Sequence, residues 1–137
     1  MSDKKYKFLS QPRRVVEDRR FVVGKGRYIA DYDHADMAHV ALLPCHLPAA
    51  TIDDIDASAA LAMPGVIDIV TGAELAAAIG PLMNGLDTPN VRRYPLAVGQ
   101  VRYAGEWVCA VIAESRAVAE DAAEKIRLQT TALPFVL

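Results

Sequence analysis

The sequence has few cysteines and no long apolar run, and each shortage excludes a class of protein. Its 137 residues include two cysteines, Cys45 and Cys109, 64 positions apart, so we expect free thiols rather than a disulfide scaffold. The longest apolar run, 107–113, has seven residues, whereas a membrane-spanning helix needs about 20. No apolar segment follows the lysines near the start, so we expect no export signal and a cytoplasmic location. A chain of this length can form one hydrophobic core without a disulfide or a metal.

Charge is unevenly distributed along the chain. The net charge is −2, but residues 1–27 hold nine Lys and Arg against three Asp and Glu, a net +6, and the remainder holds six against fourteen, a net −8. Residues 1–20 show neither hydrophobic period, which predicts a basic and flexible arm before a folded domain at 21–137. A basic arm on an acidic body favours contact with nucleic acid or with an acidic protein surface.

The two ends of the chain carry the residues that we assign to a partner interface. The arm has paired arginines, and the chain ends in an apolar segment at 133–137 without a polar closing residue. An exposed apolar end suggests that more protein packs against it. The candidate interface residues are Arg13, Arg14, Arg19, Arg20, Phe135 and Leu137.

Hydrophobic patterns and turn residues predict an α+β fold, with a mixed sheet and three short helices. Strands are predicted at 27–30, 38–43, 50–55, 66–70, 101–103, 106–113 and 127–131, and helices at 57–63, at 71–80 and after residue 115. Thr71 and Glu74 have the spacing of a capping box, and Ser115 is a second N-cap candidate. The segment 106–113 is continuously apolar, which predicts a central strand covered on both faces. Residues 81–99 are predicted to form a long surface loop.

Ligand-type side chains gather at 31–39 but lack the spacing of a metal site. A calcium loop beginning at Asp31 needs glycine at 36 and glutamate at 42, where the chain has Asp36 and Leu42. Cys45 and His46 are adjacent, which does not suit a tetrahedral zinc site. We expect a solvated turn at Asp31, Asp33, His34 and Asp36, and a hydrogen-bonded structural histidine at His39.

Known catalytic motifs also fail on spacing. The Gly24-Lys25-Gly26 run has Ile29 where a dinucleotide loop needs a third glycine. We expect Cys109 to be a buried hydrophobe and Cys45 to be accessible in a turn after its strand. No catalytic, cofactor-binding or metal-binding residue is therefore assigned.

Several segments, taken in order, are similar to one family. They are Gly24-Lys-Gly-Arg-Tyr-Ile-Ala-Asp31, Ala38-His-Val-Ala41, Ile52-Asp-Asp-Ile-Asp56, Ser58-Ala-Ala-Leu-Ala-Met-Pro-Gly-Val66, Val101-Arg-Tyr-Ala-Gly-Glu106 and Ala110-Val-Ile-Ala-Glu-Ser115. They resemble the amino-terminal α/β-hammerhead domain of molybdenum hydroxylase large subunits, the xanthine dehydrogenase and aldehyde oxidase family, over about residues 10–137. One segment departs from it: the family often has Ser-Pro-His-x-His-Ala-Arg where this chain has Cys45-His-Leu-Pro-Ala-Ala-Thr51.

The resemblance implies an oxidoreductase that hydroxylates an aldehyde or N-heterocycle with water as oxygen source. It implies a molybdopterin-type molybdenum cofactor, iron–sulfur clusters and FAD in the complete enzyme, none of them bound by this chain alone. The implied partners are molybdopterin-binding, iron–sulfur and flavin subunits or domains, and this chain is then a non-catalytic domain or small subunit. The alternative is a free-standing module whose basic arm contacts nucleic acid or an acidic protein. A small independent enzyme is a third reading, which the failed motifs disfavour.

Overall fold

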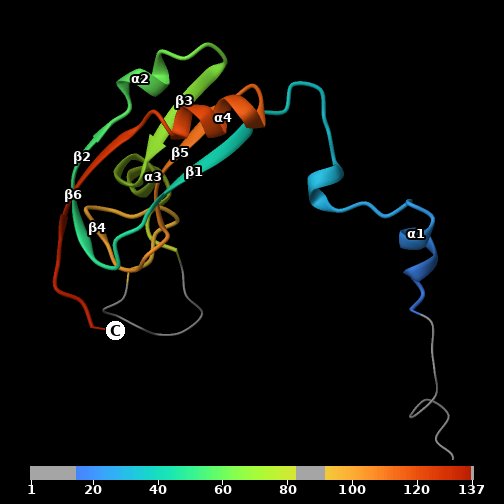
Figure 1. Cartoon of the computed structure of the whole chain (residues 1–137), viewed down its shortest axis with the longest axis horizontal. Helices are drawn as coiled ribbons and strands as arrows, with labels where there is room; N and C mark the ends of the chain where they lie inside the picture. The colour runs from blue at the N-terminus through green and yellow to red at the C-terminus, as the bar shows by residue number, and fades with distance from the viewer. Residues whose placement is uncertain (1–14, 83–91, 137) are drawn as a thin grey trace, which may run out of the picture. The chain divides into compact units, whose positions relative to one another are not determined.

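The computed structural model describes residues 15–82 and 92–136 and groups the chain into two units, 1–35 and 36–137. The first unit contains a short helix, α1 (Asp18–Val22), and a 3₁₀ turn, η1 (Ile29–Asp31) (Figure 1). The strand predicted at 27–30 is wrong. The Tyr28 N–H donates to the Asp31 carboxylate at 2.8 Å and the Asp31 N–H donates to the Tyr28 carbonyl at 3.0 Å. Such local hydrogen bonds replace strand pairing.

The second unit contains six strands and three helices. In chain order they are β1 (His39–Cys45), β2 (Ala50–Asp56), α2 (Ser58–Leu61), β3 (Val66–Thr71), α3 (Gly72–Ile79), β4 (Gln100–Val101), β5 (Glu106–Ala113), α4 (Arg116–Ala123) and β6 (Arg127–Ala132). Apart from 27–30, each predicted strand and helix is present, with its ends moved by a few residues. In the part of the chain that the structure describes, no helix is long and apolar enough to cross a membrane.

The strands form two antiparallel sheets of three strands each. One sheet has the order β1-β5-β3 and the other has the order β4-β2-β6. The α+β class and the three predicted helices are confirmed, and α1 is an additional α-helix. The mixed sheet is wrong, because every described strand pair is antiparallel. Periodicity identifies a strand but not its partner, and β5 pairs with strands that lie far away in the sequence.

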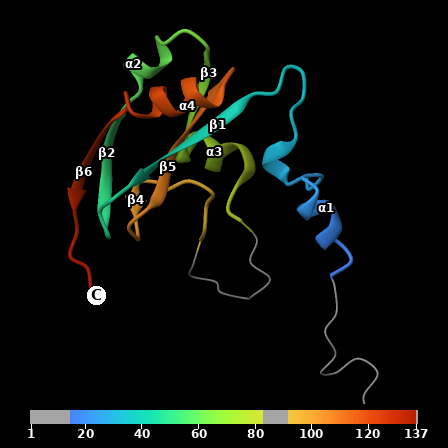
Figure 2. The same ribbon diagram turned by 45° about the vertical axis from the view of Figure 1, so that its right-hand side comes forward.

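Helix α4 covers one face of the β1-β5-β3 sheet (Figure 2). Its inner side is built from alanines that let the helix backbone lie close to the strands, followed by Ile126, which is 8% exposed. This core cluster contains Ala60, Ile69, Cys109, Val111, Ala122, Ala123 and Ile126. The predicted N-cap is confirmed, since the Ser115 hydroxyl accepts the Val118 N–H at 3.3 Å.

Helix α3 begins with the predicted capping box. The Thr71 hydroxyl accepts the Glu74 N–H at 3.3 Å, and the Glu74 carboxylate accepts the Thr71 N–H at 2.8 Å. The next residue, Gly72, is buried against the backbone of the segment before β4. A Cβ atom built there would lie 1.9 Å from the Ala97 carbonyl oxygen. Only glycine permits this approach of helix and loop.

A second core cluster lies between the two sheets and contains Cys45. The cluster comprises Cys45, Ala97, Val101 and Val108, with Leu47, Ile52, Ile55 and Leu128 packed against it. Cys45 is 4% exposed, so the prediction of an accessible thiol is wrong. The reason is that β1 does not end before Pro44. It continues past a register shift at Leu43/Pro44, and Cys45 pairs with Glu106. Proline is tolerated here because β1 is an edge strand with an irregular register.

Strand β5 is central, as predicted, but its two faces differ in cover. Cys109, Val111 and Ala113 on one face are fully buried under the helices. On the other face Val108 is buried, whereas Ala110 and Ile112 are only partly buried. The prediction that both faces of β5 are covered is therefore wrong within the described residues, because the second core cluster reaches only one end of this face.

Candidate partner interface

Three of the six predicted interface residues lie in the part of the chain that the structure describes. Arg19 and Arg20 are neighbours on α1, and Phe135 follows β6 in the other unit. Arg13, Arg14 and Leu137 lie outside the described residues. The described three are exposed, which an interface residue must be before its partner binds.

Arg20 makes contacts within α1. Its guanidinium forms an ion pair with the Glu17 carboxylate at 2.7 Å and lies 5.0 Å from the centre of the Phe21 ring. Both side chains of the ion pair are about half exposed, so the pair stabilises the helix by at most about 1 kcal/mol. The Arg20 guanidinium is held near an aromatic ring, and this arrangement is common at protein interfaces.

The described part of the first unit exposes apolar side chains. Helix α1 has no buried residue, and Val16, Val22 and Ile29 are 97%, 85% and 92% exposed. The rings of Phe21 and Tyr28 stack with their centroids 5.7 Å apart, and this pair is a local packing contact within the first unit. So much apolar surface on a short segment is typical of a segment that is covered by another protein surface.

The carboxyl-terminal end also exposes apolar groups. The Leu133 N–H donates to the Ala49 carbonyl at 2.9 Å, which ties the chain to the loop before β2. Beyond this hydrogen bond Phe135 is 53% exposed and Val136 is 98% exposed. Phe135 thus has the exposure that the prediction requires.

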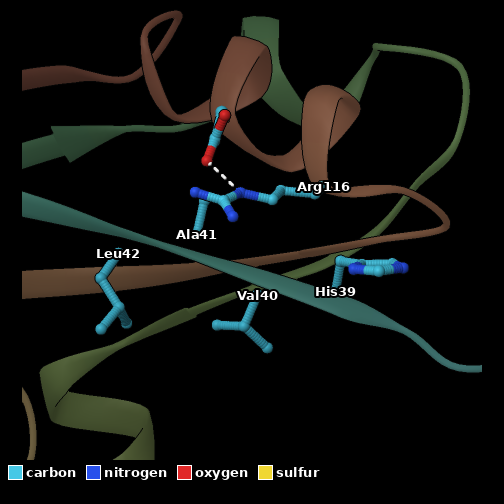
Figure 3. A pocket seen from close by; sticks show the side chains of 6 residues that line it. His39, Val40, Ala41, Leu42 and Arg116 are labelled. Carbon is cyan, nitrogen blue, oxygen red and sulfur yellow. Dashed lines mark hydrogen bonds and ion pairs between the residues drawn. The ribbon is translucent and has the colours of Figure 1, made fainter. Parts of the chain in front are cut away.

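The outer face of β1 adds a third apolar surface. Val40 and Leu42 point away from α4, whereas Ala41 points toward it (Figure 3). Val40 is 59% exposed, and its strand partner Ile112 is partly buried on the same face.

Between the strand and α4 lies a shallow hollow, where Arg116 forms an ion pair with Glu120 at 2.7 Å (Figure 3).

The ligand-type residues do not gather into a metal site within residues 15–82 and 92–136. Asp31, Asp33, His34 and Asp36 are exposed, and no three His, Cys, Asp or Glu side chains of the described chain form a group that could hold an ion. His39 is partly exposed at the start of β1. Among residues 15–82 and 92–136 its side chain forms no hydrogen bond, so the predicted hydrogen bond is absent from this part of the chain.

The two thiols are buried in different core clusters. Cys109 is fully buried between β1 and β3 under α4, and burial raises the pKa of its thiol to about 11. A thiol with that pKa stays protonated at neutral pH and is a poor nucleophile. The prediction that Cys109 is a buried hydrophobe is confirmed. Both cysteines are free rather than bridged, as predicted.

Sequence reasoning missed a groove beside β4 and β5. It has a volume of about 580 Å³ and is lined by Leu82, Arg92, Arg93, Tyr94, Pro95, Leu96, Arg102, Tyr103, Glu106 and Trp107. Part of this lining, residues 92–96, lies in the predicted surface loop at 81–99, yet Leu96 is 3% exposed. The signal that was available is a repeated pair, Arg93-Tyr94 and Arg102-Tyr103, close to the single tryptophan of the chain.

Comparison with known proteins identifies relatives over most of the chain. A family model described as "Aldehyde oxidase and xanthine dehydrogenase, a/b hammerhead domain" matches residues 23–134. The nicotine 6-hydroxylase large subunit of Paenarthrobacter nicotinovorans is 36% identical over 125 residues, which cover 89% of this chain and 15% of that protein.

Solved structures agree with the sequence relatives. The quinoline 2-oxidoreductase of Pseudomonas putida 86 superimposes with a TM-score of 0.80 at 38% identity, over 87% of this chain and 16% of that chain. The CO dehydrogenase of Oligotropha carboxidovorans superimposes with a TM-score of 0.81 at 33% identity, over 91% of this chain and 15% of that chain. The chain therefore spans about one-sixth of the length of the proteins it matches.

Proposed function

Because this chain belongs to the a/b hammerhead domain family of aldehyde oxidases and xanthine dehydrogenases, we propose that it is a non-catalytic part of a molybdopterin-dependent hydroxylase or dehydrogenase. The complete enzyme would oxidise an N-heterocycle or an aldehyde with water as oxygen donor. The names of the nicotine hydroxylase and the quinoline oxidoreductase support the heterocycle, and the family description supports the aldehyde. The same proposal places the enzyme in the cytoplasm.

The cysteine content bears on where the iron–sulfur clusters of the complete enzyme are held. Iron–sulfur clusters of this kind of enzyme are held by four cysteine thiolates each, and this chain has two cysteines, buried in separate core clusters. The iron–sulfur clusters are therefore assigned to an iron–sulfur subunit or domain, and by the same proposal the molybdopterin-type molybdenum cofactor and FAD belong to the molybdopterin-binding and flavin subunits or domains. This chain would frame the molybdopterin-binding part.

One observation carries the docking role in this proposal: the exposed apolar surface of the first unit. Val16, Val22 and Ile29 are almost fully exposed, and burying each of them against a partner would stabilise the complex by about 1.5–3 kcal/mol before the entropy cost of docking. The basic residues of the arm, with Arg19 and Arg20 among them, would add attraction to an acidic partner surface.

The test is capture of the co-expressed remainder of the enzyme by the 137-residue chain. Removal of residues 1–20, or the substitutions Val22→Asp and Ile29→Asp, should leave the second unit folded and reduce capture about tenfold or more. Leu61→Asp is the matched control, since Leu61 is 51% exposed on α2 and lies in the second unit. Capture that is unchanged by all three variants of the first unit would contradict a docking role.

The same material separates the enzyme part from the nucleic-acid module. If the arm binds DNA or RNA, log K should fall by about 0.9 per phosphate contact for each tenfold rise in salt, without any partner protein. A protein-docking arm should respond less steeply, because apolar burial does not depend on counterion release. Tight nucleic-acid binding that is lost on truncation, with no protein captured, would refute the proposal.

A further inference from the structure

The groove beside β4 and β5 concentrates two kinds of side chain that are scarce in the second unit. Residues 36–137 contain six Lys and Arg, and three of them, Arg92, Arg93 and Arg102, line the groove. The same residues contain four aromatic side chains, and three of them, Tyr94, Tyr103 and Trp107, line it as well. None of these six residues belongs to the predicted interface set, so the groove is a separate feature of the molecule.

Backbone hydrogen bonds hold the walls of the groove together. The Leu82 N–H donates to the Arg93 carbonyl at 2.8 Å, and the Ala97 N–H donates to the Trp107 carbonyl at 2.7 Å. The turn between β4 and β5 is closed by the Glu106 N–H, which donates to the Tyr103 carbonyl at 3.2 Å. Because the first two bonds join segments that are ten or eleven residues apart and the third closes a turn, the arginines and aromatic rings are presented by a hydrogen-bonded frame.

The groove is positively charged on an acidic unit. Residues 36–137 hold six basic and twelve acidic side chains, a net −6, yet the groove lining has three arginines and one carboxylate. That carboxylate, Glu106, accepts the backbone N–H of Arg102. The three arginines are exposed, and within residues 15–82 and 92–136 none of them forms an ion pair. A ligand of opposite charge is favoured here and disfavoured over the rest of the unit.

We propose that this groove is a docking site for an acidic segment of a protein partner, one that carries Asp or Glu side chains beside an apolar or aromatic residue. Trp107 is 49% exposed and Tyr103 is 61% exposed, and they offer apolar rings next to the guanidinium groups. Tyr, Trp and Arg are the residues that most often dominate the binding energy of protein interfaces. The arginines would pair with the carboxylates, and the rings would pack on the apolar side chain.

Two features favour a protein segment over a small anion or a nucleic acid. The described chain has no buried polar side chain, so the groove lacks the enclosed polar group that orients a small ligand. A nucleic acid needs a run of phosphate contacts, and the net charge of −6 on the surrounding unit would repel the flanking phosphates. A short acidic peptide segment needs only the three arginines and the exposed rings.

Trp107 is the single tryptophan of the chain, so its fluorescence reports on the groove directly. The probe is a short peptide of alternating glutamate and phenylalanine, added to the 137-residue chain. We expect a saturable change in Trp107 emission as the peptide is added. The affinity for the peptide should fall severalfold when salt rises from about 0.05 to about 0.3 M. The peptide with lysine in place of glutamate should give no saturable change.

Charge reversal then tests the assignment of residues. The double variant Arg92→Glu and Arg102→Glu should weaken binding of the acidic peptide about tenfold or more. The control reverses the same number of charges at Lys125 and Arg127, two exposed residues after α4, and should bind within about twofold of the unchanged chain. The milder pair Arg92→Gln and Arg102→Gln should give an intermediate loss, with circular dichroism confirming the fold of every variant.

Specific outcomes would overturn the inference. Equal binding of the lysine peptide would show unspecific apolar adhesion. Displacement of the acidic peptide by inorganic phosphate at similar concentration would show a simple anion site. Tighter binding of a single-stranded oligonucleotide, lost in the double variant, would show a nucleic-acid site. Because these measurements use no other subunit, their outcome is independent of the enzyme assembly proposed above.

Discussion

The approach of Gly72 to the Ala97 carbonyl leads to the sharpest stability prediction. Gly72 is the first residue of α3, and an alanine Cβ there would lie 1.9 Å from the Ala97 oxygen and 3.2 Å from the Leu96 oxygen. A contact of at least 3.0 Å needs a shift of about 1.1 Å (3.0 − 1.9). Ala97 is also tied to Trp107 by its N–H at 2.7 Å, so the loop moves only by breaking a hydrogen bond.

The magnitude of the Gly72→Ala effect follows from two costs and one gain. Overpacking against a fixed backbone costs about 1–3 kcal/mol. Disruption of the hydrogen bond between Ala97 and Trp107 costs about 1 kcal/mol more, and the better helix propensity of alanine offsets at most about 1 kcal/mol. We expect Gly72→Ala to lower the free energy of unfolding by about 2–3 kcal/mol.

Urea unfolding, followed by circular dichroism and by Trp107 fluorescence, measures this change. The matched control is Ala73→Gly, at the next and exposed position of the same helix, which should cost about 0.5–1 kcal/mol through propensity alone. Gly72→Ala should therefore be clearly more harmful than Ala73→Gly. If Gly72→Ala is as stable as the unchanged chain, the close approach of α3 to the segment before β4 is incorrect.

Further predictions concern the thiols, the capping box and the core. Both Cys45 and Cys109 should react slowly with a disulfide reagent until urea unfolds the chain, and one fast thiol in the native state would contradict burial of Cys45. Thr71→Ala should lower the free energy of unfolding by about 1 kcal/mol in the same urea assay. The hydrogen bonds from Thr71 lower the pKa of the Glu74 carboxyl below its usual 4.5. The ionised carboxylate therefore stabilises the fold above pH 4.5, and this stabilisation is lost as the pH falls through the lowered pKa. The variant Glu74→Gln should reduce the fall of the urea unfolding midpoint at acid pH. An unchanged fall would argue against the capping box. Ile126→Ala should cost about 2–4 kcal/mol in a thermal or urea melt, and a loss below about 1 kcal/mol would contradict its place in the core.

Features that depend on neighbours in the sequence were determined by the sequence itself. The Thr71 capping box and the Ser115 N-cap each need a hydrogen bond over three residues, and both were predicted at the correct position. The strands at β1, β2, β3, β5 and β6 followed from apolar runs and turn residues, and the family followed from short motifs that run through the chain. These features can be predicted from the sequence because they depend on residues that are close together in it.

Features that depend on pairing between distant segments were decided only by the tertiary structure. Cys45 is buried because β1 passes Pro44 and pairs with Glu106, which lies 61 residues later in the sequence. The groove exists because Arg92 and Arg93 come beside Arg102 and Trp107 through hydrogen bonds that no period of the sequence encodes. The open face of β5 likewise reflects how far each core cluster extends. Burial and pairing between distant segments depend on the whole fold, because many packing contacts together select one register among several that a strand permits.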